Sequence, residues 1–334
     1  MKDGFGREID YARISVTDKC NMRCRYCMPS DIEHLDMKDI LTFEEIAETV
    51  SCMADLGISK IRLTGGEPLV RRGICDLVAI LKGINGVKEV NITTNGLLLA
   101  EYLPDLCKAG IDGVNISIDT LDPVRYKWVT GCDGLSKVLS GVKACISAGL
   151  RVKINAVTGK IKDPKTGEYS DPYEDVSGLI DFAKDKNVCV RFIELMPIGF
   201  AKDYPSISHE DLISRFLETY PDAVISDSDG NGPAKYYKIP GHMGETGFIS
   251  AISDRFCADC NRVRLTTKGF LKSCLCYDKG ADLKGILRSA GSASDRYEKL
   301  TCVIKETILE KPFGHDFLHE DNVTEKHAMS AIGG

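Results

Sequence analysis

The sequence lacks a run of apolar residues long enough to cross a membrane, and no apolar segment of the signal-peptide kind follows its first residues. It also lacks an excess of positive charge, since 43 Lys and Arg stand against 49 Asp and Glu, for a net charge of −6. A broad nucleic-acid interface needs a basic face, so this balance argues against one. We therefore expect a cytoplasmic protein that binds neither membranes nor nucleic acid.

Internal repeats and low-complexity tracts are also missing from the 334 residues, of which 43% are hydrophobic and 28% charged. This is the composition of an ordinary globular protein, and the length allows one large domain and one smaller one. The sequence pattern changes just after Pro197. We therefore predict a first domain over residues 1–200 and a second over residues 201–334.

The sequence is rich in cysteine, with fourteen in all. Three of them, Cys20, Cys24 and Cys27, form a C-x3-C-x2-C run. In a reducing compartment, cysteines act as metal ligands or small buried residues more often than as disulfides. Three thiolates can hold three irons of a cubane cluster and leave the fourth iron open to a second molecule. The spacing thus indicates a reactive iron–sulfur cluster and not one that only stores electrons. A structural zinc site with one remote ligand is the alternative.

A second group of cysteines occurs late in the chain, as Cys257 and Cys260 in a C-x2-C pair followed by Cys274. This set again offers three thiolates and a vacancy. A zinc site that uses Cys276 or His242 as its fourth ligand is the alternative. Because Cys274 and Cys276 are separated by one residue, spacing does not decide which of them is the third ligand.

Short β-like segments recur through the first two thirds of the chain, each followed by a helical pattern. We expect strands at residues 12–17, 60–64, 89–93, 113–118, 151–157 and 188–195. Helices are expected at 42–57, where Thr42 and Glu45 form a capping box, and at 135–149, while 158–175 is expected to be a surface loop. Six βα units predict an α/β fold, a partial (β/α)6 TIM-like barrel closed by a smaller C-terminal α+β domain.

The expected strands alternate between polar and apolar residues. Arg13 and Ser15 flank Ile14, and Arg62 and Thr64 flank Leu63. Strands covered on both faces read as continuous apolar runs, so alternation means that one face meets polar surroundings. If the apolar faces meet the helices, the polar faces line a lumen that holds water and a polar ligand. A sheet face open to solvent is the alternative.

A Gly-Gly-Glu-Pro sequence, residues 65–68, directly follows the second expected strand. Barrel active sites lie at this end of the strands, and paired glycines allow a close approach of the backbone. Together with the cysteine run, in which Tyr26 precedes the last cysteine, this motif resembles the radical S-adenosylmethionine (SAM) superfamily. The resemblance implies a [4Fe–4S] cluster on Cys20, Cys24 and Cys27 whose open iron binds SAM, and a 5′-deoxyadenosyl radical formed from it. It places Gly66, Ser117, Met196 and the backbone of Tyr26 at SAM.

Two arginines, Arg262 and Arg264, follow the second cysteine group in alternate positions. A strand would point both side chains the same way, and two guanidinium groups beside a metal suit a phosphate-bearing ligand. A solvated charged strand face is the alternative. With Arg13, Arg62, Lys153 and Arg191 they predict a cationic lumen in an acidic protein, which suits a polyanionic small molecule.

The complete set of motifs resembles one family closely, the GTP 3′,8-cyclases of molybdenum cofactor biosynthesis. The similar segments are residues 13–20, 62–69, 93–96, 115–119, 191–194, 256–265 and the terminal Gly333-Gly334. The resemblance implies a second [4Fe–4S] cluster on Cys257, Cys260 and Cys274 that binds the guanine of GTP. The residues that it places at GTP are Arg13, Arg62, Thr93, Lys153, Arg262 and Arg264.

The same resemblance implies a reaction in which hydrogen leaves ribose C3′ and C3′ then joins C8 of guanine. Arg262, Arg264, Gly333 and Gly334 are the residues that it implicates in catalysis; a frayed terminus is the alternative for the two glycines. It also implies an electron donor such as flavodoxin or ferredoxin and a downstream cyclic pyranopterin monophosphate synthase, and it is compatible with a homodimer. A two-cluster peptide maturase and a zinc or iron–sulfur regulatory protein are the competing hypotheses.

Overall fold

The computed structural model describes residues 1–28, 34–160, 162, 166–226, 232–325, 327 and 329–332. Gly333 and Gly334, to which the family resemblance assigns a catalytic role, lie outside the described residues.

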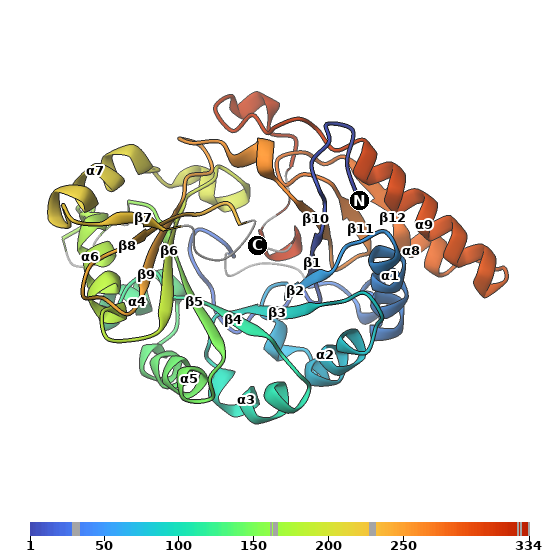
Figure 1. Ribbon diagram of the computed structural model, residues 1–334, viewed down its shortest axis with the longest axis horizontal. Helices are drawn as coiled ribbons and strands as arrows, with labels where there is room; N and C mark the ends of the chain where they lie inside the picture. The colour runs from blue at the N-terminus through green and yellow to red at the C-terminus, as the bar shows by residue number, and fades with distance from the viewer. Residues whose placement is uncertain are drawn as a thin grey trace.

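Six parallel strands, each followed by at least one helix, form the frame of the molecule (Figure 1). The strands are β1 (Tyr11–Ser15), β2 (Lys60–Thr64), β3 (Glu89–Thr94), β4 (Gly113–Ser117), β5 (Arg151–Thr158) and β6 (Val188–Glu194). The helices are α1 (Phe43–Asp55), α2 (Ile74–Lys82), α3 (Leu99–Lys108), α4 (Pro123–Thr130), α5 (Leu135–Ser147) and α6 (Pro172–Ala183). They cover the outer face of the curved sheet, which confirms the predicted partial barrel.

The C-terminal part of the chain extends the same sheet at both edges. β9 (Glu245–Ile249) pairs in parallel with β6, and β8 (Lys235–Lys238) and β7 (Val224–Ser226) continue that edge. β10 (Arg262–Leu265) pairs in parallel with β1, followed by β11 (Phe270–Lys272) and β12 (Gly280–Asp282). The sheet therefore runs β12-β11-β10-β1-β2-β3-β4-β5-β6-β9-β8-β7. A domain boundary near residue 200 stays a prediction.

The remaining helices are α7 (His209–Thr219), α8 (Leu283–Leu287), α9 (Ala293–Leu309) and α10 (Met329–Ile332). α9 lies beside α1 on the outside of the barrel, and α10 lies inside the curve of the sheet (Figure 1). The expected loop at 158–175 is shorter than predicted, because Asp171 caps α6 with its side chain and Pro172 begins the helix.

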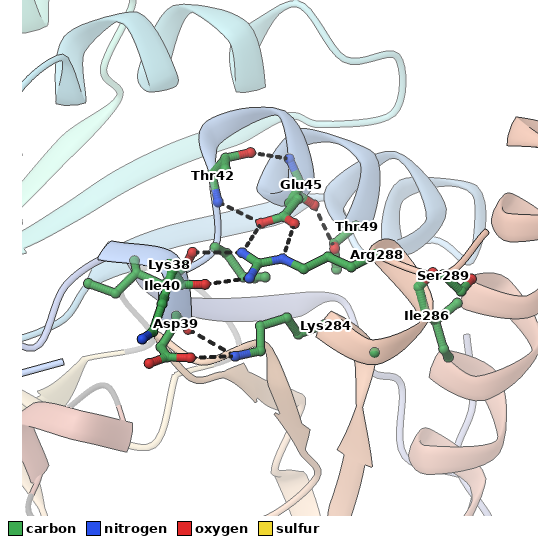
Figure 2. A network of polar contacts seen from close by, with 12 residues as sticks. Lys38, Asp39, Ile40, Thr42, Glu45, Thr49, Lys284, Ile286, Arg288 and Ser289 are labelled. Carbon is green, nitrogen blue, oxygen red and sulfur yellow. Dashed lines mark hydrogen bonds and ion pairs between the residues drawn. The ribbon is translucent and has the colours of Figure 1, made fainter. Parts of the chain in front are cut away.

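A network around Arg288 fastens α8 to the start of α1 (Figure 2). Its guanidinium group contacts both carboxylate oxygens of Glu45, at 2.6 and 3.0 Å, and donates to the carbonyl of Ile40 at 3.0 Å. The same Glu45 accepts from the backbone N–H of Thr42 in the predicted capping box. One carboxylate thus caps the start of α1 and also holds Arg288, at the end of α8, against it.

The apolar core lies between the sheet and its surrounding helices, where Ile14, Leu63, Ile92, Ile116 and Ile154 are completely buried. These are the apolar members of the alternating strands, so the polar members face the inside of the curve. Among the described residues, no helix is long and apolar enough to cross a membrane.

Candidate active site

The first cysteine trio lies on the loop that leaves β1. Hydrogen bonds from the backbone N–H groups of Arg23 and Arg25 to the end of α4, at 2.9 and 3.0 Å, hold this loop in place. Burial raises the pKa of the Cys24 thiol well above its usual range, and the nearby Cys27, Asp119 and Cys20 raise it further. The structure thus brings the three predicted ligands together.

Hydrogen-bond donors point at the first of these sulfurs. The backbone N–H of Met22 lies 3.4 Å from Cys20 Sγ, and the Asn95 side-chain amide lies 3.7 Å from it. Donors of this kind are a normal feature of iron–sulfur sites. Cys132, from the segment after α4, also lies near Cys24 but packs against the apolar core.

Tyr26 lies between Cys24 and Cys27 in the sequence, and hydrogen bonds to the ends of β4 and β5 fix its side chain. Its hydroxyl donates to Asp119 Oδ2 at 2.7 Å, and Asp119 Oδ1 accepts from the backbone N–H of Val157 at 2.9 Å. Burial raises the pKa of Asp119 to about 6. Asp119 was absent from the predicted site residues. Its place two residues after Ser117, in the same period-2 series as Asn115 and Ser117, was the signal that could have found it.

The two glycines after β2 are required by the trio loop itself. A Cβ atom at Gly65 would lie 2.4 Å from the carbonyl oxygen of Thr17, and one at Gly66 would lie 2.3 Å from that of Lys19. We expected these glycines to admit a ligand, but the close approach observed is to the backbone leading into Cys20. The adjacent Glu67 is buried and accepts from Thr94 Oγ1 at 2.7 Å and Asn95 N at 2.6 Å. The ends of β1, β2 and β3 are thereby tied together.

The other two residues predicted at SAM come from further round the barrel. Ser117 ends β4 opposite Asn155 of β5, and Met196 lies two residues beyond the end of β6. Parallel strands present their carboxyl ends at one edge of the sheet, so both lie on the rim that carries the first trio.

The second trio is assembled from two turns. Cys257 and Cys260 lie in and just after a 3-10 helix (Phe256–Asp259) that precedes β10, and Cys274 follows β11. Burial raises the pKa of Cys257, as do the neighbouring thiols of Cys260 and Cys274. Burial would also raise the pKa of Cys260, but Arg262 and Lys311 lower it to about 7. These three thiols are therefore neighbours in a cationic setting.

The alternative ligands of the second site are placed differently. Cys276 is fully buried in a small apolar cluster with Ile198 and Phe317, and burial raises its pKa to about 11. His242 packs its ring against Tyr220, with ring centres 5.9 Å apart, next to α7. Cys274 is the more accessible of the two cysteines, although both lie near Cys257, so the choice of Cys274 as third ligand stays a prediction. The ring contact of His242 is with Tyr220.

Cationic side chains line the lumen at one level of the sheet. The strand register sets Arg13 of β1 opposite both Arg62 of β2 and Arg264 of β10, and sets Arg264 opposite Lys272 of β11. Neighbouring strands lie about 4.8 Å apart, so these four side chains crowd one another. A cavity here has a lining of mainly polar and cationic residues, which includes Tyr11, Arg13, Lys60, Arg62, Asn91, Asn115, Arg151, Lys153, Asn155, Arg191, Tyr236, Asn261 and Arg262. Its lining also includes the acidic Glu89, which pairs with Arg151. The predicted polar lumen is thus confirmed.

The electrostatics of this cavity favour an anion. Burial and the neighbouring Arg262 together lower the pKa of Arg264 to about 10. Burial would raise the pKa of Tyr11, but Arg62 and Arg13 lower it to about 8. Several cations gathered at one level of the lumen give it a positive potential, which favours a bound anion.

Several polar atoms of the cavity have no hydrogen-bond partner among the described residues. They are Arg62 Nη1, Thr93 Oγ1, Asn261 Oδ1 and Arg262 Nε. Buried polar groups are nearly always paired in folded proteins, so unpaired ones indicate a ligand or ordered water. Arg62 and Arg262 were predicted at this position from the sequence, as was Thr93.

Sequence reasoning missed Tyr11, which lines the cavity, and Lys272, which lies opposite Arg264 on the neighbouring strand. Tyr11 precedes Arg13 by two residues and accepts a hydrogen bond from Arg62 Nε, so the period-2 pattern could have found it. Lys272 lies on β11, which was not predicted as a strand, and pairs with the buried carboxylate of Glu325. Glu325 is only 1% exposed, so the C-terminal segment supplies a negative charge at the edge of the cationic lumen.

Comparisons with known proteins agree with this geometry. The radical SAM superfamily model matches residues 14–166, and the Molybdenum Cofactor Synthesis C model matches residues 188–317. GTP 3′,8-cyclases of Alkaliphilus oremlandii and Clostridium perfringens are 44% and 43% identical to the chain, over all of both chains in each case. The structure of Streptococcus suis SuiB bound to S-adenosylmethionine superposes with a TM-score of 0.64 at 14% identity, over 96% of this chain and 76% of that one.

The partial barrel, with its three-cysteine loop after β1 and Gly-Gly-Glu-Pro loop after β2, defines a radical SAM enzyme. Its relatives extend over its full length at well above 30% identity. The chain belongs to the GTP 3′,8-cyclase family.

Membership of the radical SAM superfamily implies a [4Fe–4S] cluster and SAM, and the first trio fits this group. Its three thiols are gathered on one loop with N–H donors directed at sulfur. Among the described residues, no group of His, Cys, Asp or Glu side chains is placed to hold a single metal ion. A cubane takes one thiolate for each iron, so its ligands need not converge on one point as those of zinc do.

Proposed function

We propose that this chain converts GTP into (8S)-3′,8-cyclo-7,8-dihydroguanosine 5′-triphosphate, the first step of molybdenum cofactor biosynthesis. The observation that carries the proposal is a cavity rich in arginine and lysine inside a chain that has two cysteine trios and is a full-length relative of GTP 3′,8-cyclases. GTP carries several negative charges on its phosphates, and a buried group of arginines and lysines is the chemistry that recognises them.

In this proposal the first trio, Cys20, Cys24 and Cys27, holds the cluster that binds SAM. Gly66, Ser117, Met196 and the backbone of Tyr26 lie at SAM. When bound, the cluster and SAM supply a 5′-deoxyadenosyl radical, which takes H3′ from the ribose. The hydrogen bond between Tyr26 and Asp119 stiffens this wall of the site, at 2.7 Å.

The second trio, Cys257, Cys260 and Cys274, holds a second [4Fe–4S] cluster in our proposal. Its three thiols are neighbours, and the backbone N–H of His315 lies 3.4 Å from Cys257 Sγ. An open iron at this end of the lumen would take the guanine. The C3′ radical would then add to C8 of guanine, and one further electron from the donor together with one proton would convert the resulting radical into the 7,8-dihydro product.

Six residues of the lumen hold the ribose and phosphates in this proposal. They are Arg13, Arg62, Thr93, Lys153, Arg262 and Arg264. Nη1 of Arg62 and Nε of Arg262 have no hydrogen-bond partner among the described residues, so they can donate to phosphate oxygens. Arg262 and Arg264 also lie close to Cys260, so they can orient the substrate against the second cluster. Gly333 and Gly334 are proposed to complete the site from the C-terminus.

The proposed reaction sets the partners of the enzyme. A one-electron donor such as flavodoxin or ferredoxin must reduce the first cluster, and a cyclic pyranopterin monophosphate synthase would consume the product. We propose that the protein works in the cytoplasm. A homodimer is compatible with this function.

An anaerobic assay tests the proposal. The purified chain should contain about eight iron atoms, those of two cubanes. With dithionite, SAM and GTP it should release 5′-deoxyadenosine together with the cyclised nucleotide. Formation of 5′-deoxyadenosine that is indifferent to GTP would contradict the proposed substrate, and zinc in place of iron would contradict the chemistry.

Two matched variants separate the roles of the trios. Cys24→Ser should abolish SAM cleavage altogether and leave about four irons on the second trio. Cys260→Ser should leave the first cluster and some uncoupled SAM cleavage but no cyclised nucleotide. The reverse pattern would overturn the assignment of the two sites.

A further inference from the structure

A buried arginine lies beside the second trio on the segment that precedes β1. The Arg7 side chain is 7% exposed and its Nε lies 2.6 Å from Oδ2 of Asp3, which is 0% exposed. Asp3 Oδ1 also accepts from the backbone N–H groups of Phe5 and Arg7, at 3.0 and 2.9 Å. Arg7 is therefore oriented by its own turn before it contacts any other part of the chain.

The far end of the guanidinium group donates to main-chain oxygens of two distant segments. Nη1 lies 2.8 Å from the carbonyl oxygens of both Cys257 and Phe313. Nη2 lies 2.7 Å from the carbonyl oxygen of Pro312 and 3.4 Å from that of Lys311. Because the donors of arginine are held in a rigid plane, this arrangement fixes the first cysteine of the trio relative to residues 311–313.

Lys311 extends the same arrangement to the other cysteines. It is 3% exposed, and its ammonium group donates to the carbonyl oxygen of Arg262 at 2.9 Å and to that of Ser273. Arg262 follows Cys260 by two residues, and Ser273 directly precedes Cys274. Each segment that carries a cysteine of the trio is thus tied through a carbonyl to Arg7 or Lys311.

Core packing does not fix the turn that carries Cys257. Its 3-10 helix, Phe256–Asp259, contains no buried residue. A short turn without buried side chains is held by its hydrogen bonds, and charged donors make the strongest of these. Removing Arg7 would therefore free Cys257 more than it would disturb the sheet.

We propose that Arg7 is a positioning residue for the second cysteine trio, fixing the Cys257 turn directly and the segments of Cys260 and Cys274 through the main chain of Lys311. The inference rests on the proposed function, which makes these three cysteines ligands of a cluster. Arg7 touches neither substrate nor cluster in this role; it sets where the three thiolates stand.

The test uses full-length protein in which Cys20, Cys24 and Cys27 are all alanine, so that a reconstituted cluster reports only the second trio. Arg7→Ala should weaken retention of iron by about 10- to 100-fold against a chelator, the usual cost of removing an outer-shell partner. Arg7→Lys keeps the charge but loses the planar fork, so it should recover part of the affinity. The EPR spectrum of the reduced cluster should also change in Arg7→Ala.

Arg296→Ala is the matched control. This arginine pairs with Glu48 at 2.7 Å between α9 and α1, away from both trios. Its removal should change neither the iron retained nor the spectrum. Thermal unfolding followed by circular dichroism shows whether any variant has lost its fold.

A second readout does not depend on any cluster. In the metal-free chain with all its cysteines, we expect Arg7→Ala to change the alkylation rates of Cys257, Cys260 and Cys274 by about fivefold or more, the factor expected from losing hydrogen bonds to a charged group. The rate at Cys24 should stay as in the parent chain. Peptide mass spectrometry measures each site separately.

The outcomes are distinguishable. If Arg7→Ala keeps its iron, spectrum and thiol reactivities, the proposal is overturned. It is equally overturned if Cys24 becomes as reactive as the second trio, because Arg7 would then serve only the general fold. If the parent chain binds no cluster on the second trio, the proposed function fails there, while the alkylation rates still decide the role of Arg7.

Discussion

The first trio lies on one loop, whereas the second is drawn from segments on either side of β10 and β11. Their surroundings differ as well. Asp119 and Glu67 stand near the first trio, and burial raises the pKa of both Cys20 and Cys24. Arg262 and Lys311 stand near the second, where they lower the pKa of Cys260 to about 7.

This contrast matches the charges of the two proposed ligands. SAM carries a positive sulfonium group, which acidic surroundings tolerate, while GTP is a polyanion that suits the cationic end. One barrel thus carries two cysteine trios whose surroundings differ in charge. The chain achieves this by lining one rim from β1–β6 and building the other end from C-terminal strands.

The largest predicted effect comes from adding a methyl group beside each trio, because the backbone packs more tightly around the first trio than around the second. Gly66→Ala should cost the first trio its cluster and lower SAM cleavage by about 100-fold or more, because the new methyl group would meet the carbonyl oxygen of Lys19 at 2.3 Å. Gly314 is the matched position at the second trio, where a Cβ would lie 3.5 Å from that of Cys257, an ordinary contact. Gly314→Ala should retain activity within about twofold.

Iron content after reconstitution measures both variants directly. Each is examined with the other trio replaced by alanine, so that the iron belongs to one site. A Gly66→Ala protein that keeps its iron would mean that the trio loop can move away from β2. The contrast in packing between the two sites would then be wrong.

The second prediction concerns the cationic end. Arg264→Ala and Arg262→Ala should each weaken GTP binding by about 10- to 100-fold, the effect of losing charge-assisted contacts to a phosphate, while both clusters remain. Asp119→Asn, which removes a charge near the first trio, should leave GTP affinity unchanged. Anaerobic equilibrium binding measures all three. Unchanged affinity in both arginine variants would remove their proposed role.

More residues of the first site than of the second could be predicted from the sequence, because the first site is built from local patterns. The first trio, Gly66 and the strand residues Arg13 and Arg62 follow from local spacing and period-2 alternation. Lys272, Glu325 and Arg7 show no local signal, because their importance comes from contacts with residues far away in the chain. Sequence patterns also missed β7, β11 and β12, whose three residues each are too few for a period to register.

The pairing of β9 with β6 illustrates the same limit for the fold. Six βα units were readable, but nothing in the pattern at Glu245–Ile249 shows that it would extend the barrel in parallel. That position is set by the buried contacts of Phe248 with Phe192 and Phe216, whose ring centres lie 5.5 and 5.3 Å from it. Tertiary packing, which a local pattern does not encode, decided the edge of the sheet.

The smallest predicted effect concerns His209, a buried histidine outside both trios, whose protonation should change stability without changing either site. His209 begins α7 and is fully buried, with Nε2 2.8 Å from Thr158 Oγ1 and Nδ1 3.1 Å from Ser250 Oγ. It therefore links β5 to the segment after β9. Burial lowers the pKa of His209 from 6.5 to about 4, outweighing the nearby Glu194 carboxylate.

The sign of the pH dependence follows from this shift. In the unfolded chain His209 takes up a proton near pH 6.5, whereas in the folded chain it stays neutral to about pH 4. Acidification through this window therefore favours the unfolded state, by at most ~1.4 kcal/mol for each pH unit, and above it the group contributes no pH dependence. His209→Gln should lose this component. Urea unfolding of the metal-free parent and variant at pH 7.5 and pH 5 measures the difference, and equal pH dependence in both chains would show that His209 titrates normally when folded. The imidazole contacts neither trio, so the variant should still bind iron and GTP as the parent does. The acid sensitivity of the contact between β5 and the segment after β9 would then be separate from the chemistry of the lumen.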